Sequence, residues 1–167
     1  MKKQYSILSV LCVLTLSFFL ANCGSKKDET LVTEFNSKKT SADNMLTKTD
    51  ADIKQMKADH TAWTAKLDSV AKLAKADTAK INWFKGEMKK HEDMAKAASG
   101  MISDSIKAAE GAKTENNDQL KAAIAGLDAQ MASGAASWKN VMDAHQKLGS
   151  DITAFLGGAA VAGVPAV

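Results

Sequence analysis

Apolar residues recur along this chain at alternating intervals of three and four positions, in three separate stretches. The first stretch comprises Ile53, Met56, His60, Trp63, Leu67, Val70 and Ala74. The second comprises Ile81, Phe84, Met88, His91, Ala95, Ala98 and Ile102. The third comprises Leu120, Ile124, Leu127, Met131, Gly134, Trp138, Val141, His145, Leu148, Ile152 and Phe155. This spacing keeps an apolar seam on one face of a helix, so the pattern predicts three long amphipathic helices.

Short segments rich in capping and turn residues separate the three stretches. Short connections place consecutive helices antiparallel, so we expect an all-α, up-down-up three-helix bundle over residues 41–156. A break at Ser99-Gly100 in the second helix would make four helices instead. The capping candidates, in chain order, are Ser41 or Asp43, the stretch 75–78, Gly111 as a C-terminal stop, and Thr114 and Asn117.

The regions outside the predicted bundle differ from it in composition. Residues 1–22 join two lysines to a long apolar run and are followed by polar residues, as in a cleaved secretion signal. Residues 23–40 are polar and lysine-rich, which predicts a flexible tether with an r.m.s. span on the order of 20 Å. Residues 157–167 form a small-residue, apolar tail, for which we expect a loose terminus or a docking segment.

The end of the signal carries a recognisable motif, Leu20-Ala21-Asn22-Cys23. This quartet resembles the lipobox of bacterial lipoproteins. Asn22 departs from the usual Gly, Ala or Ser, as in the relaxed boxes of spirochaetes and the Bacteroidetes group. The resemblance implies cleavage before Cys23, acyl chains on that residue, and a lipid anchor in the cell outer membrane, with the body on its periplasmic or its surface-exposed face.

Composition then excludes several functions. Removal of residues 1–22 takes away two lysines and no acid, so the formal charge falls from +3 to +1. The chain has no arginine, the residue that reads phosphates and base edges best, which argues against nucleic acid as a partner. Cys12 lies in the signal, so Cys23 is the one cysteine of the mature chain and no disulfide or thiol nucleophile remains.

Catalytic motifs are missing as well. There is no Gly-rich phosphate loop, no Gly-x-Ser-x-Gly and no His-Glu-x-x-His. Ser69-x-x-Lys72 matches the Ser-x-x-Lys motif of penicillin-interacting enzymes, but the companion motifs Ser-Asp-Asn and Lys-Thr-Gly are missing. We therefore expect the protein not to be an enzyme. The sequence favours a non-enzymatic binding, adhesin-like or structural module of the cell envelope. Such a module could bind a protein partner, and the sequence does not define its oligomeric state.

The three histidines are the one constellation with chemical promise, because all of them fall on the predicted seams. A seam takes two of every seven positions, so chance would place three residues there in roughly 2% of arrangements. Each histidine follows a methionine by three or four positions, which puts an imidazole and a thioether on one helix face. The pairs are Met56 and His60, Met88 and His91, and Met142 and His145.

Counting residues from the expected turns gives each histidine a height in the bundle. From a first turn near residues 76–77, His60 and His91 fall within about one helical turn of the same level. From a second turn near Thr114, Trp138 joins that level, whereas His145 lies about 13 Å away. The count argues against a three-histidine site and leaves a site formed by His60 and His91.

Met56 and Met88 would flank that two-histidine site, and imidazole with thioether favours copper, especially Cu(I), over zinc. The segment 84–96 is faintly similar to the Met-x-x-His-His helix of small copper-associated, ferritin-like helical proteins, although it has Lys90 beside His91 and lacks the second histidine. This resemblance implies a small envelope copper-binding protein. A haem held by two histidines is a further alternative. The chain has no Cys-x-x-Cys-His motif, so such a haem would not be covalently attached.

A plainer interpretation needs no cofactor beyond the lipid. His60, His91 and His145 would form polar layers that hydrogen-bond across the bundle and fix its register. Neutral buried imidazoles that gain a proton near pH 6 would also make this a pH-sensitive core.

Overall fold

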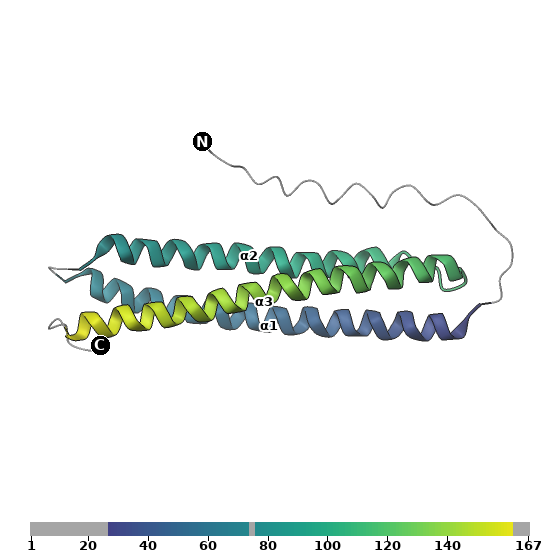
Figure 1. Ribbon diagram of the computed structural model, residues 1–167, viewed down its shortest axis with the longest axis horizontal. Coiled ribbons are helices and arrows are strands. Elements are labelled where there is room, and N and C mark those ends of the chain that lie inside the picture. The colour runs from purple at the N-terminus through teal and green to yellow at the C-terminus, as the bar shows by residue number, and fades with distance from the viewer. Residues whose placement is uncertain (1–26, 74–75, 162–167) are drawn as a thin grey trace, which may run out of the picture.

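Three long helices and their short connections form the described part of the chain. The computed structural model describes residues 27–73 and 76–161. Within these ranges α1 (Glu29–Ala71), α2 (Thr78–Glu110) and α3 (Asn117–Val161) run up, down and up, and each helix packs against both others (Figure 1). No strand occurs in either range. The predicted three-helix bundle is confirmed, and α2 continues unbroken through Ser99 and Gly100 instead of splitting in two.

The first helix begins earlier than the sequence predicted. Asp28 caps it, because its side chain accepts hydrogen bonds from the backbone N–H groups of Thr30 and Leu31. Phe35 is buried in the core, with Leu31 and Val32 packed beside it. The prediction that residues 29–40 form a flexible tether and that the bundle starts at residue 41 is therefore wrong. Cys23 and the signal lie outside the described residues.

The other helix ends agree with the sequence in part. Asp77 caps α2 through the backbone N–H of Lys80, and Gly111 follows its last residue, both as expected. The cap of α3 is Asn116, whose side-chain oxygen accepts from the N–H groups of residues 118 and 119, and not Thr114 or Asn117. At its far end α3 extends to Val161, so the first five residues of the expected tail are helical. The remainder of the tail, 162–167, lies outside the described residues.

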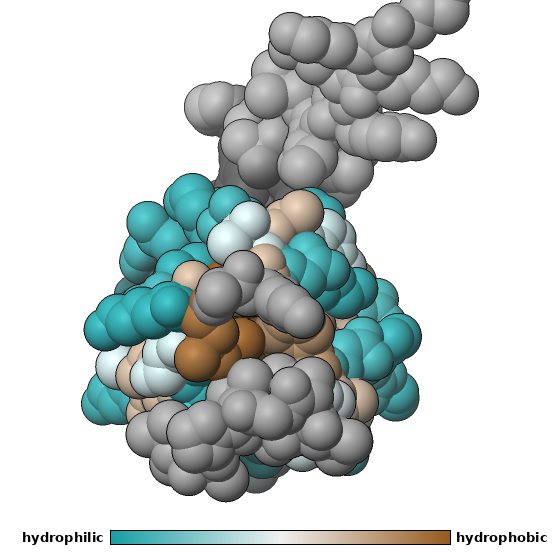
Figure 2. Space-filling model, turned by 90° about the vertical axis from the view of Figure 1, so that its left-hand side faces the viewer, coloured by the Kyte–Doolittle hydropathy of each residue, from teal (hydrophilic) through white to brown (hydrophobic). Residues whose placement is uncertain are grey.

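The core is divided into three clusters along the bundle. The first cluster consists of Phe35, Ala42, Ile102, Ile106, Ala109, Leu120, Ile124 and Leu127. The middle cluster consists of Met56, Ala95, Ala98, Trp138 and Val141. The last cluster consists of Leu67, Ile81, Phe84, Met88, Leu148 and Ile152. At the end where α1 meets α2, Figure 2 shows an apolar area near the centre of the face, with hydrophilic residues toward the rim. Val70, Ala76 and Phe155 pack on the last cluster.

The α2–α3 connection runs along the bundle axis instead of turning at one level. At the end of α2, Glu110 pairs with Lys39 of α1 at 3.2 Å. At the start of α3, the Asn117 side chain accepts a hydrogen bond of 3.1 Å from the N–H of Asp28. Residues 28 and 39 are separated by about 16 Å at 1.5 Å per helical residue. The segment 111–116 covers this distance, so α3 starts that much farther along the bundle axis than the point where α2 ends.

Candidate metal site

One histidine from each helix meets the other two at a single level of the bundle. His60 comes from α1, His91 from α2 and His145 from α3, and one ring nitrogen of each lies within 4.8 Å of the other two. The His60 ring centroid is 5.2 Å from that of His145 and 6.4 Å from that of His91. Their exposures are only 4%, 6% and 7%. The three side chains thus form a buried triangle between the middle and last core clusters.

This arrangement overturns the height count made from the sequence. His145 is in contact with His60 instead of about 13 Å away. Trp138, which was expected at the histidine level, belongs to the middle cluster and donates its indole N–H to Asp52 at 3.3 Å. The count assumed a level turn near Thr114, whereas the connection climbs along the axis. A three-histidine site is therefore what the fold assembles.

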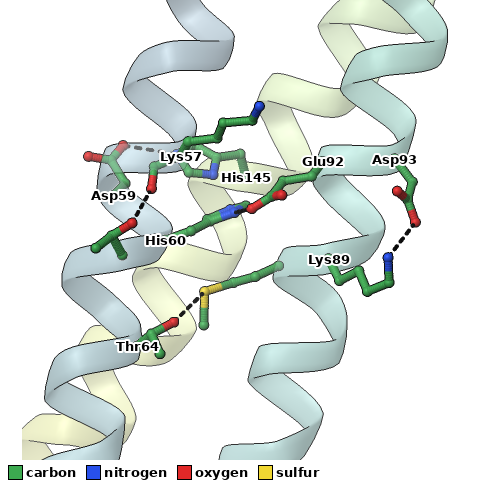
Figure 3. Close-up of polar contacts among 10 residues, drawn as sticks. Lys57, Asp59, His60, Thr64, Lys89, Glu92, Asp93 and His145 are labelled. Carbon is green, nitrogen blue, oxygen red and sulfur yellow. Dashed lines mark hydrogen bonds and ion pairs between the residues drawn. The ribbon is translucent and has the colours of Figure 1, made fainter.

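Two carboxylates orient two of the rings (Figure 3). Glu92 of α2 lies 2.8 Å from Nδ1 of His60, and Asp59 of α1 lies 3.1 Å from Nε2 of His145. A carboxylate only accepts hydrogen bonds, so each of these ring nitrogens carries the proton. The opposite nitrogens, Nε2 of His60 and Nδ1 of His145, are left as lone pairs in the neutral rings.

Three ring nitrogens are buried and lack any hydrogen-bond partner among the described residues. They are Nε2 of His60, Nδ1 of His91 and Nδ1 of His145. A buried polar atom without a partner costs about 1–3 kcal/mol, and native structures rarely leave several such atoms in one place. A cation bound between the rings, or an ordered water, would satisfy all three.

Burial keeps two of these rings in the neutral form that a metal requires. It lowers the pKa of His60 below the usual 6.5, against the opposing effect of the Glu92 hydrogen bond. It also lowers the pKa of His91, and the neighbouring His60 and His145 lower it further. At neutral pH His60 and His91 therefore offer lone pairs and not positive charges.

No protein-family model, curated protein or solved structure matches this chain. The chemistry of the site therefore rests on its geometry. Among the described helices, none has an apolar run of the length that crossing a bilayer takes.

Trp63 forms one wall of the site. Its ring stacks on His145 with centroids 4.9 Å apart, and lies 5.6 Å from His60. Gly149 makes this possible, because a Cβ at that position would come within 2.8 Å of the indole. Trp63, His145, Gly149 and neighbouring residues of α3 also line an open groove, which gives the site a side facing solvent.

The methionines expected to flank the site lie in the apolar layers on either side of it. Met56 packs in the middle cluster and Met88 in the last cluster. The Met88 sulfur accepts a hydrogen bond from the Thr64 hydroxyl at 3.8 Å (Figure 3). Met142 packs against the middle cluster. The atoms that meet at the histidine level are therefore imidazole nitrogens.

The site does not suit a haem held by His60 and His91. The rings of His145 and Trp63 lie 5.2 Å and 5.6 Å from His60 and occupy the space beside it. A porphyrin would have to displace both. The donor set and the available space fit a single ion instead.

Sequence reasoning missed Asp59, Glu92 and the third histidine as parts of one site. A signal for the acids was present, since Asp59 precedes His60 and Glu92 follows His91. Each acid, however, contacts a histidine of another helix, so neighbours in sequence are not partners in space. The pairing depends on the relative heights of the helices, which the sequence pattern did not supply.

Proposed function

We propose that this chain is a lipid-anchored envelope protein that binds one transition-metal cation through His60, His91 and His145. The observation that carries this proposal is the convergence of three buried, unpartnered imidazole nitrogens, one from each helix. Its function is non-enzymatic: to hold or to deliver the ion.

The ligand set favours late first-row metals. Imidazole suits zinc, copper and nickel, and three protein ligands leave a further position for water or an exogenous ligand. With metal–nitrogen distances of about 2.0–2.1 Å, tetrahedral geometry needs ligand nitrogens roughly 3.3 Å apart. The described separation of up to 4.8 Å is wider, so binding draws the rings together by side-chain rotation.

The proposed anchor is close in sequence to the end of α1 that is far from the histidines. The lipid on Cys23 precedes the start of α1 at Glu29 by six residues. His60 lies 31 residues further on, or about 46 Å along the helix axis. The metal site is thus carried well away from the anchored end of the bundle.

A titration of the full-length chain in detergent tests metal binding. After dialysis against chelator, Zn²⁺, Co²⁺ and Cu²⁺ are added and uptake is followed by calorimetry and, for Co²⁺, by visible absorbance. We expect one ion per chain in the wild type and none at this site in a variant with His60, His91 and His145 replaced by Ala. No uptake by the wild type, or equal uptake by both, would overturn the metal site and leave the histidines as a polar layer of the core.

The lipid anchor has a separate test. Palmitate labelling in a diderm host of the group with relaxed lipoboxes should mark the wild type, and the Cys23→Ser variant should stay unlabelled. The labelled protein should partition into the detergent phase, because three acyl chains anchor firmly where one does not. An unlabelled wild type that stays in the aqueous phase would overturn the anchor and leave the metal site unaffected.

A further inference from the structure

We infer that Asp59 and Glu92 make the histidine site selective for a divalent cation over a soft monovalent one. This inference rests on the proposed metal site and names the class of ion that it takes. Neither carboxylate touches the metal position. Both act as positioning residues through the rings that they hold.

Charge balance is the first argument. A metal ion binds imidazole in its neutral form, so the three ligands bring no charge, whereas the two carboxylates that hold His60 and His145 bring two negative charges. A divalent ion therefore leaves the group neutral, whereas a monovalent ion leaves one negative charge uncompensated on carboxylates that are 40% and 34% exposed. On the His91 side, Glu87 and Lys90 pair with each other at 2.7 Å and cancel.

Ring orientation is the second argument. The bond from Nδ1 of His60 to Glu92 directs Nε2 inward, and the bond from Nε2 of His145 to Asp59 directs Nδ1 inward. A carboxylate that accepts the second ring N–H fixes the tautomer and makes the free nitrogen more basic. More basic nitrogen ligands favour borderline divalent ions.

The thioethers that precede the three histidines by one helical turn pack in the apolar layers on either side of them. The described residues contain no cysteine. The Met88 thioether is hydrogen-bonded to Thr64. Met56 packs in the middle cluster, and Met142 packs against it. Thiolate and thioether ligands are the ones that select soft ions such as Cu(I), so a site of imidazoles alone gives such ions no advantage over divalent ones. This reverses the preference for Cu(I) drawn from the Met–His spacing.

The test compares Co²⁺ with Ag⁺ in the full-length chain purified in detergent. Glu92→Gln and Asp59→Asn keep the size of each side chain and remove its charge. The matched control is Asp93→Asn. Asp93 follows Glu92 in the sequence, its side chain is 70% exposed, and it pairs with Lys89 at 3.6 Å (Figure 3). Circular dichroism and thermal melting of the metal-free variants check that the fold is retained.

We expect each site variant to bind Co²⁺ about 10–100-fold more weakly, with shifted visible bands, while Ag⁺ affinity changes much less. The Asp93→Asn control should match the wild type in both respects. Equal Co²⁺ affinity in wild type and site variants, or parallel losses for both ions, would overturn the inference while metal binding stands. A wild type that takes up neither ion would overturn the metal site itself.

Discussion

At the residue scale, Gly149 determines how Trp63 can cover the histidines. A Cβ added there would lie 2.8 Å from one indole carbon and 3.0 Å from another. In Gly149→Ala the indole must move off His145, and overpacking of this kind costs about 1–3 kcal/mol. The matched control is Gly126→Ala, where no atom lies within 4 Å and helix propensity should add about 0.5–1 kcal/mol. Urea unfolding measures both, and equal gains in the two variants would contradict this account of Gly149.

The buried imidazoles also set a pH dependence for the metal-free protein. Burial lowers the pKa values of His60 and His91, so the unfolded chain binds protons more readily than the folded one. Their contribution to stability is complete above the unfolded pKa of 6.5 and is lost as the pH falls below it, although the half-exposed Glu92 reduces the effect. Urea unfolding with chelator from pH 8 to pH 5 should show this decline.

A double variant separates the histidines from other titrating groups. His60→Leu with His91→Leu removes two buried nitrogens that lack partners, so the free energy of unfolding of the metal-free protein should stay the same or rise at pH 7. The decline in stability between pH 7 and pH 5 should become shallower. A large loss of stability at pH 7 would mean that the rings contribute favourable contacts to the metal-free fold.

At the scale of elements, α1 begins at Glu29 and not at residue 41, because the apolar three-four repeat is hard to detect in its first half. Between Phe35 and Ile53 the seam passes through Ala42 and Thr49, both buried but weakly apolar, so the apolar repeat is interrupted there. If residues 29–40 form part of the bundle, Phe35→Ala should destabilise it by about 3 kcal/mol. The control, Asn36→Ala at an exposed neighbour, should change stability by less than about 0.5 kcal/mol. A flexible tether would make the two variants equal in urea unfolding.

At the scale of the whole molecule, the sequence predicted which faces meet but not at which heights. Every predicted seam position of α2 is buried, because a three-four repeat determines the face of a helix. The three-four repeat does not show how far the segment 111–116 runs along the axis. That run is what brings His145 to the level of His60 and His91. The cross-helix carboxylates depend on the same heights. The fold was therefore predictable, whereas the meeting of three histidines at one level was not.

The site connects all three helices at one level, so metal binding should stabilise the bundle as a unit. An ion that binds only the folded chain adds about 2.7 kcal/mol at a free concentration 100 times its dissociation constant. Because His60, His91 and His145 belong to different helices, no local unfolding of one helix preserves the site, and the whole transition should move to higher temperature. Thermal melting followed by circular dichroism, with and without Zn²⁺, measures the shift. The variant lacking all three histidines should melt at the same temperature in both conditions, and a Zn²⁺ shift of wild-type size in that variant would place the ion elsewhere.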